Sequence, residues 1–385
     1  MQEPASPAGA WFAARWTRLN GPARIAGVDL ARGLAVLGML AAHLVTLEHL
    51  VWSDPSTWAG IVQGRSSILF ATLAGVSIGL VTGGEQPWEG ERMTTARLRL
   101  VVRAFLLWIL GVALIATGVP VYVILPAYAI LFLVAIPFTR LRARTLFVIA
   151  AGCALVTPVV ATMLGTLPFW ESENGSFLSA LLGWRYPFVS WITFVLAGLA
   201  VARIGVRRLR VQVWLVAAGV ALTAAAGALD ALTGAKLEAG AEAETLWEHI
   251  WTAGPHSGGV LEVVGSGGFA LAVLGASLLL CRTVVVWIVL PLRAVGSMPL
   301  SAYAAQLVVW AALSSLLLGD PGSLFPFRAL NPLPAFAVGT IVACTIWALT
   351  VGRGPLEWLT DRVIRFAVPA PSSPGPIATP DRLER

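Results

Sequence analysis

Charged residues are scarce in this sequence, and their scarcity argues against an ordinary soluble protein. Asp, Glu, Lys and Arg make up 12% of the 385 residues, about half of the ~25% that is typical of soluble domains. Hydrophobic residues account for 57%, and the mean hydropathy is +0.81. With long apolar runs between the charges, this composition predicts an all-α polytopic membrane protein.

Cysteine, histidine and lysine are also rare. The three cysteines lie far apart in or beside apolar runs, which favours buried small hydrophobes over a disulfide or a metal site. The four histidines have no regular spacing, so no metal is expected. Lys236 is the one lysine among 26 basic residues, and no basic patch with interleaved aromatics suggests a nucleic-acid partner.

A helix needs about 20 apolar residues to span a bilayer, and ten apolar runs are long enough to do so. They are 28–50, 60–82, 98–118, 121–138, 145–167, 187–204, 211–230, 258–281, 296–318 and 333–352. An even number of spans puts both termini on one side. Most arginines fall in loops on that side, which the positive-inside rule assigns to the cytoplasm. The lipid bilayer is thus the first expected partner.

The remaining segments are short. Residues 1–27 are expected to be a cytoplasmic segment without ordered structure. They are not a cleaved signal, because the following apolar run exceeds a signal's 7–15 residues. Residues 28–352 form the bundle, 353–367 an amphipathic helix on the inner face, and 368–385 a disordered Pro/Ser-rich tail. The run 284–292 is too short to cross.

Polar residues follow one stripe of the first span. Asp29 and Arg32 are three residues apart, so they are neighbours on a helix and can pair. His43 comes eleven residues after Arg32. On a helix, its side chain points within about 20° of the Arg32 direction and lies about 16 Å further along the axis. A stripe of this kind faces the bundle interior. For Asp29 and Arg32, a purely structural ion pair is as good an explanation as a functional role. For His43, a buried histidine that is hydrogen-bonded to a neighbour is likewise as good an explanation as a functional one.

A second polar group is expected at the outer side. His49 and His256 flank spans one and eight, and histidine suits proton transfer near neutral pH. Glu262 lies in the outer half of span eight and needs a partner, for which Arg65 or a histidine is available. Tyr303 and Gln306 add polar groups in span nine. The glycines of span eight permit close helix packing, ligand access or a homodimer.

Several segments resemble one family, the heparan-α-glucosaminide N-acetyltransferase-like membrane proteins and their bacterial relatives of unassigned function. "RIAGVDLARGLAVLGMLAAH" is similar to the family's first span and "GRSSILFATLAGVSIGL" to its second. "YPFVSWITFVLAGLAVAR", "GSMPLSAYAAQLVV" and "GPLEWL" resemble later elements. The resemblance covers roughly residues 24–366. The arginine-, alanine- and glycine-rich composition indicates a high-GC, actinobacterial member of the bacterial branch.

The resemblance implies a transmembrane acyltransferase of the cell envelope. Acetyl-CoA or another acyl-CoA would donate from the cytosol, and the acceptor would be an extracytoplasmic amino sugar, glycan or lipid-linked molecule. The implied roles are as follows: catalytic, His43, His49, His256 and Glu262; cofactor-binding, Asp29, Arg32 and Arg103; substrate-binding, Arg65, Tyr303 and Gln306. The family's catalytic histidine follows the first span by several residues, where this chain has "LVTLEHLVWSD". His43 and His49 therefore compete for that role.

Two other classes fit the same residues. A transporter or flippase would also have ten spans, intramembrane charges and glycine-rich helices, although the lack of an internal repeat disfavours it. A membrane scaffold would leave Asp29, Arg32, Glu262 and Gln306 without a use.

Overall fold

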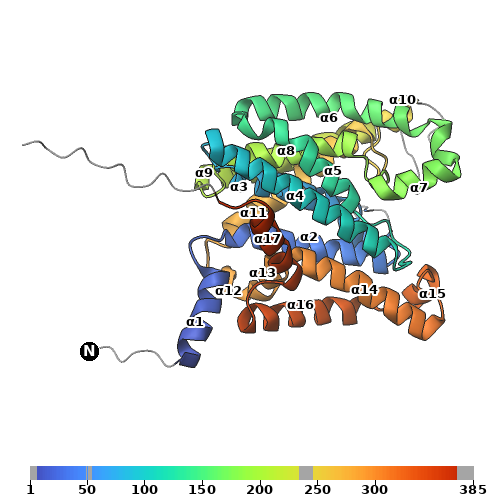
Figure 1. The fold of residues 1–385 in the computed structure, drawn as a ribbon. Coiled ribbons are helices and arrows are strands. Elements are labelled where there is room, and N and C mark those ends of the chain that lie inside the picture. The colour runs from blue at the N-terminus through green and yellow to red at the C-terminus, as the bar shows by residue number, and fades with distance from the viewer. Residues whose placement is uncertain (1–6, 49, 51–53, 234–245, 371–385) are drawn as a thin grey trace, which may run out of the picture.

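The computed structural model describes residues 7–48, 50, 54–233 and 246–370. Within these residues the fold is a bundle of helices without strands, which confirms the predicted fold class (Figure 1). Eight helices are long and apolar enough to cross a membrane. Two of the ten expected spans are shorter apolar helices, Leu125–Arg140 and Phe188–Ile204. The chain is thus a multi-pass membrane protein.

The helices with the most buried surface form the centre of the bundle. They are α2 (Ala26–Leu44), α3 (Arg65–Val81, preceded by the 3-10 helix η1, Pro55–Val62), α8 (Phe188–Ile204) and α11 (Val260–Leu280). Around them lie α4 (Gly90–Ile115), α5 (Leu125–Ala135, continued by η2, Ile136–Arg140), α6 (Ala143–Gly165), α9 (Leu209–Thr233), α14 (Pro299–Leu318) and α16 (Leu333–Thr350). The outer helices leave large apolar side chains exposed, as lipid-facing helices do.

Short helices lie between and beyond the spans. They are α1 (Pro7–Asn20), η3 (Pro168–Glu171), α7 (Glu173–Leu182), α10 (Leu246–Ile250), α12 (Val285–Ile288), α13 (Leu290–Ser297), α15 (Leu324–Ala329) and α17 (Pro355–Ala367). In Figure 1, α1 lies at one end of the bundle, and α7, α10 and α15 lie at the other. We call these ends the α1 side and the α7 side.

Glycines allow the central helices to touch. A Cβ on Gly75 of α3 would come within 2.0 Å of the Val195 carbonyl oxygen, and one on Gly198 of α8 within 1.9 Å of the Thr72 oxygen. Small residues at such crossings let helix backbones approach closely. Gly268 of α11 meets Gly219 of α9 in the same way. That glycine of the eighth span is therefore covered by α9 of the same chain.

Two segments differ from the sequence expectations. The first span ends at Leu44 rather than at residue 50, because Val45 is extended (φ −121°, ψ 143°). The N-terminal segment is helical from Pro7 to Asn20 instead of unstructured. Its C-terminal end is fixed by Arg293, which donates to the Leu19 carbonyl at 3.2 Å and to Asn20 Oδ1 at 2.9 Å. The amphipathic helix α17 occurs where it was predicted, and the run 284–292, predicted to be too short to cross, forms the short α12 and the start of α13.

Candidate functional site

Three cavities lie within the described part of the bundle. The arginine cavity, about 750 Å³, lies on the α1 side, and the tryptophan cavity, also about 750 Å³, lies on the α7 side. The histidine cavity, about 390 Å³, shares Gly64, Arg185 and His256 with the tryptophan cavity. Each takes its name from residues described below.

The arginine cavity collects guanidinium groups from three helices and from two loops. Arg18, Arg24, Arg32, Arg103 and Arg353 line it, together with Ser77, Tyr128 and Glu357. Arg103 forms no hydrogen bond or ion pair with any described residue. Glu357 is already engaged, because its carboxylate accepts from the backbone N–H groups of Leu300 and Ser301 at the start of α14. The cavity therefore has an excess of uncommitted positive charge.

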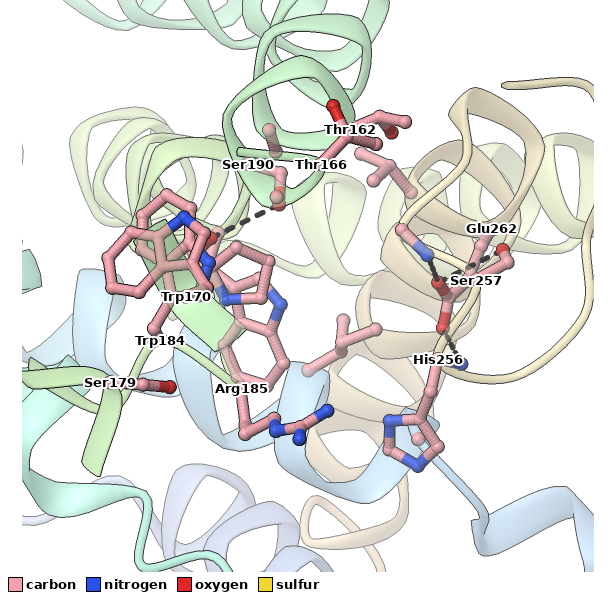
Figure 2. A pocket seen from close by; sticks show the side chains of 18 of the residues that line it. Thr162, Thr166, Trp170, Ser179, Trp184, Arg185, Ser190, His256, Ser257 and Glu262 are labelled. Atoms are coloured by element: carbon pink, nitrogen blue, oxygen red, sulfur yellow. Dashed lines mark hydrogen bonds between the residues drawn. The ribbon is translucent and has the colours of Figure 1, made fainter. Parts of the chain in front are cut away.

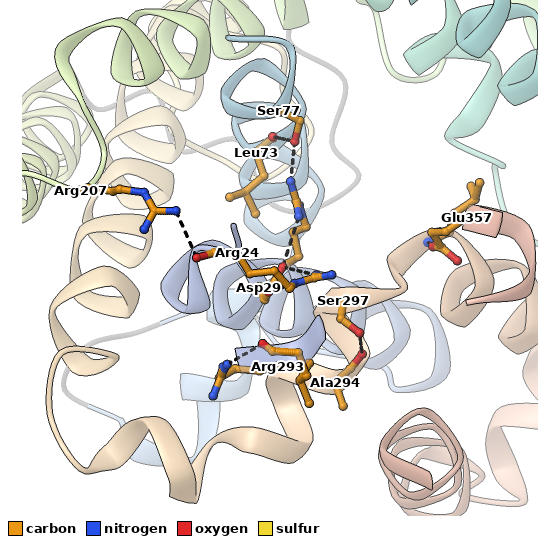
Figure 3. A network of polar contacts seen from close by, with 12 residues as sticks. Arg24, Asp29, Leu73, Ser77, Arg207, Arg293, Ala294, Ser297 and Glu357 are labelled. Atoms are coloured by element: carbon orange, nitrogen blue, oxygen red, sulfur yellow. Dashed lines mark hydrogen bonds and ion pairs between the residues drawn. The ribbon is translucent and has the colours of Figure 1, made fainter. Parts of the chain in front are cut away.

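Asp29 orients two of these arginines (Figure 3). Arg24 donates to both Asp29 oxygens, at 2.8 and 2.7 Å, and Arg32 donates to Oδ1 at 3.4 Å and to Ser77 Oγ at 2.6 Å. The Asp29–Arg32 pair predicted from the i,i+3 spacing is thus present. Asp29 is 2% exposed and does not line the cavity, whereas both arginines do. Its carboxylate acts on the cavity through the arginines it holds.

Other arginines on the α1 side are bound to the protein itself. Arg203 is 5% exposed and donates to the carbonyls of Gly79, Gly84 and Thr139 and to Thr82 Oγ1, at 2.5–2.9 Å. Arg207 donates to the Pro22 carbonyl at 2.7 Å and to the Arg24 carbonyl at 3.3 Å, the second of which Figure 3 shows. Guanidiniums bonded in this way satisfy carbonyls left over at helix ends. They differ in kind from the arginines that line the cavity.

The histidine cavity brings together His43 from α2 and His256 from the loop before α11. Tyr303 lines it from α14, Arg328 lines it from α15, and Arg185 lines it from the segment between α7 and α8. The Arg328 Nε donates to the His43 carbonyl at 2.9 Å, which ties α15 to the end of α2. Partial burial lowers the pKa of the Arg328 guanidinium. Two candidate bases therefore face one cavity.

Glu262 shapes the loop that carries His256. Its Oε1 accepts from the His256 N–H, and its Oε2 accepts from the Gly258 N–H, both at 2.6 Å (Figure 2). His256 has φ +64°, a left-handed conformation that is uncommon for residues other than glycine and often marks functional sites. The expected side-chain partner of Glu262 is thus wrong: backbone amides and Ser257, rather than Arg65 or an imidazole, satisfy this carboxylate.

The tryptophan cavity has an aromatic wall opposite His256 (Figure 2). The rings of Trp170 and Trp184 stack at 4.6 Å with an interplanar angle of 12°. Trp191 and Phe194 extend the wall from α8, and Ser179 and Ser190 supply hydroxyls. A flat aromatic face beside a few polar groups is typical of a small-molecule site with one apolar and one hydrogen-bonding side.

Arg185 joins the two α7-side cavities, and the sequence analysis did not select it. It follows Gly183, whose φ of +64° ends α7 and whose Cβ position lies 2.6 Å from the Ala127 nitrogen. The Arg185 guanidinium lies 4.9 Å from the Tyr122 ring centre. Next to it, burial raises the pKa of Tyr186 to about 12, and its hydroxyl donates to the Tyr122 carbonyl. The "WRYP" sequence offered a signal, since two aromatic residues enclose an arginine at a membrane boundary.

One layer of side chains separates the arginine cavity from the histidine cavity. Three segments of the chain contribute to both cavities with residues that are one to three positions apart. The histidine cavity is lined by Ser67, Ile124 and Tyr303, and the arginine cavity is lined by Phe70, Leu125 and Leu300 of the same segments. Three residues advance about 4.5 Å along a helix. Tyr128 closes the layer by donating from its hydroxyl to the Ser67 carbonyl at 3.1 Å, and Tyr303 Oη accepts from the Ile124 N–H at 3.3 Å. We call this layer, with Tyr128 and Tyr303 and the two hydrogen bonds that they form, the tyrosine partition.

Two predicted residues, Arg65 and Gln306, are absent from the cavity linings, and a third is not described. The Arg65 guanidinium lies 5.8 Å from the Phe269 ring centre, and its Nε and Nη1 are buried without a hydrogen-bond partner. The Gln306 amide donates to Thr340 Oγ1 at 3.1 Å between α14 and α16, so it lies apart from the three cavities. His49 lies outside the described residues.

Comparison with known families agrees with these observations. Residues 24–229 match the family described as heparan-alpha-glucosaminide N-acetyltransferase, catalytic, and residues 210–366 match a family described as a protein of unknown function (DUF418). The first match includes α2 and the aromatic wall, and the second includes α11, α14 and α17. Searches of curated proteins and of solved structures gave no significant match. The chain thus belongs to the heparan-alpha-glucosaminide N-acetyltransferase-like family of transmembrane acetyltransferases.

Proposed function

We propose that this protein moves an acetyl or other acyl group from acyl-CoA on the α1 side to an acceptor on the α7 side. The acceptor class is an amino sugar, a glycan or a lipid-linked molecule. The α1 side is proposed to be cytoplasmic, with both termini there, and the membrane is proposed to be the bacterial inner membrane. The observation that carries the proposal is the tyrosine partition, because it puts two cavities of different chemistry back to back.

The arginine cavity suits the donor. Acyl-CoA carries phosphates, and arginine forks bind phosphate oxygens in pairs. Arg32 and Arg103 are the proposed phosphate ligands. Arg103 has no hydrogen-bond or ion-pair partner among the described residues, and Asp29 and Ser77 hold Arg32 in place. The remaining length, about 16 Å from Arg32 to His43 along α2, suits an extended acyl-pantetheine arm that passes the partition.

The histidine cavity suits the transfer step. His43 is the proposed base, with His256 as the second candidate and His49 still open. The base takes a proton from the acceptor amine or hydroxyl, whose nitrogen or oxygen then bonds to the acyl carbon. The carbon–sulfur bond of the thioester breaks, and the CoA sulfur leaves and takes up a proton. Glu262 is proposed as a positioning residue for His256, and Tyr303 as an acceptor contact.

The test uses the full chain in detergent micelles with radiolabelled acetyl-CoA and glucosamine. We expect saturable acetyl-CoA binding and N-acetylglucosamine as a product. Arg103→Gln should weaken binding, whereas Arg142→Gln, at an exposed position before α6, should not. If acetyl-CoA does not bind, or binds and is never used for transfer to any sugar or lipid-linked acceptor, the acyltransferase proposal fails and the transporter alternative gains support.

A further inference from the structure

The side chains that can carry charge near neutral pH in the lining of the histidine cavity are all basic. Arg185, Arg328, His43 and His256 line it, and no Asp or Glu among the described residues does. The tryptophan cavity differs, because Glu171 and Glu262 line it. The histidine cavity is therefore a small space with two fixed positive charges and two groups that can become positive.

Both arginines have donors to spare. Arg185 stacks over Tyr122 and forms no hydrogen bond or ion pair with a described residue. Arg328 uses Nε on the His43 carbonyl, which leaves its two terminal nitrogens without a protein partner among the described residues. Stacking on an aromatic ring leaves the in-plane N–H groups of a guanidinium available. Each arginine can therefore bind two oxygens of one ligand group.

Neither Arg185 nor Arg328 forms an ion pair with a carboxylate of the described residues. Glu262, the closest acidic residue in the sequence to His256, attracts that imidazole when it is protonated, but its two oxygens accept from loop N–H groups and not from the arginines. The five ion pairs formed between described residues all involve other arginines. An anionic ligand group is the natural complement, because charge-assisted bonds to arginine strengthen where water is partly excluded.

We infer that the histidine cavity binds an anionic group of the acceptor, a carboxylate or a phosphate, with Arg185 and Arg328 as specificity-determining residues. This inference rests on the proposed function, which assigns the acceptor to the α7 side. Arg185 directly follows Trp184 of the aromatic wall and lines both cavities. A sugar ring against Trp184 and its anionic substituent near Arg185 therefore occupy adjacent positions.

The experiment compares three amino sugars that share one amine and differ in charge: glucosamine, glucosamine 6-phosphate and muramic acid, which carries a carboxylate. Binding to the full chain in detergent micelles is measured by titration calorimetry. We expect at least one of the charged sugars to bind about tenfold tighter than glucosamine, about 1.4 kcal/mol. Tighter binding of the phosphate sugar alone identifies a phosphate, and of muramic acid alone a carboxylate.

Variants attribute the preference to the arginines. Arg185→Gln should remove most of the difference between charged and uncharged sugars. Arg328→Lys keeps the charge but loses the fork, and it should reduce the difference by a smaller factor. Arg142→Gln is the matched control and should keep it. Acetyl-CoA affinity is measured on the same samples and should not change, which separates this inference from the proposed function.

Two results overturn the inference. One is equal binding of the three sugars, or no binding of either charged sugar, by a wild-type protein that still binds acetyl-CoA. The other is a preference for charged sugars that survives in both Arg185→Gln and Arg328→Lys. A failure of acetyl-CoA binding instead counts against the proposed function, whatever the sugars do.

Discussion

The arginine cavity and the histidine cavity lie at opposite faces of one layer of side chains, yet they are built differently. On the α1 side, Arg24, Arg32 and Arg353 are held by carboxylates, Asp29 and Asp361. On the α7 side, Arg185 and His256 come from loops that aromatic stacking and backbone hydrogen bonds hold. Ion pairs with carboxylates thus orient the arginines of one site, whereas the other takes Arg185 and His256 from loops, where ligand specificity commonly changes.

The largest expected effect tests whether the histidine cavity is the reaction centre. His43→Ala should lower the turnover number for acetyl transfer by about 10²–10⁴-fold, which is typical for loss of a general base. Acetyl-CoA affinity should stay within a factor of about three, because His43 does not line the arginine cavity. Steady-state kinetics with radiolabelled donor measure both.

His256→Ala serves as the comparison. If His43→Ala keeps full activity and His256→Ala loses it, the two histidines exchange roles. If the double variant is fully active, the reaction centre lies elsewhere, and the comparison between the two cavities loses its chemical meaning.

The next effect contrasts structural with cavity-lining arginines. Arg203→Gln should destabilise the fold by about 3 kcal/mol, because it leaves buried carbonyls of Gly79 and Thr139 without donors. Thermal unfolding of the detergent-solubilised protein measures this loss. Acetyl-CoA affinity of the folded fraction should be unchanged, and a selective loss of affinity at normal stability would contradict the distinction.

Arg103→Gln should give the opposite result. We expect acetyl-CoA affinity to fall by about 10–100-fold, the value of one or two charge-assisted hydrogen bonds at about 1.5–3 kcal/mol. The melting temperature should stay close to wild type, since Arg103 forms no hydrogen bond with a described residue. Dephospho-CoA, which lacks the 3′-phosphate, should lose less affinity than CoA on this substitution if that phosphate is what Arg103 binds.

A smaller effect concerns the aromatic wall. Trp184→Ala removes the 4.6 Å stack on Trp170 and should raise the acceptor KM by about 3–15-fold, equivalent to about 0.5–1.5 kcal/mol of aromatic contact. Trp184→Phe keeps a ring and should recover most of the affinity. An unchanged KM in Trp184→Ala would show that the acceptor does not use this wall.

The smallest effect concerns the partition itself. Tyr128→Phe removes the hydrogen bond to the Ser67 carbonyl while keeping the ring, a change of about 1 kcal/mol. We expect the turnover number to rise by up to about fivefold if opening of the partition limits the rate, with acetyl-CoA affinity unchanged. A fall in the turnover number would show that the Tyr128 hydroxyl contributes to acyl transfer instead of keeping the partition closed.

Local patterns in the sequence predicted the spans and one half of the site well. Apolar runs located the spans because a bilayer imposes a minimum length on any helix. The Asp29–Arg32 pair and the placement of His43 on the same stripe followed from helical spacing. The helix α17 also follows from its amphipathic pattern, and the run 284–292 was too short to cross. Each of these depends on residues that are close in the chain.

The other half of the site could not be read in this way. The Arg24–Asp29 pair crosses a helix start, Arg328 reaches His43 across 285 positions, and the Glu262 carboxylate turns back onto its own loop. Gln306 looked like a cavity residue and instead meets Thr340 on a neighbouring helix. Spacing gives the direction of a side chain on its helix, but it does not give the neighbour that it meets.

The sequence by itself determined a multi-pass helical membrane protein, its family and a polar stripe along its first span. It did so because hydrophobic length and helical period are local properties. Only the tertiary structure decided that five arginines face one cavity, that His43 and His256 share another, and that Tyr128 and Tyr303 close the layer between them. Those facts depend on which helix faces which, and close contacts at glycines such as Gly75 and Gly198 set that arrangement.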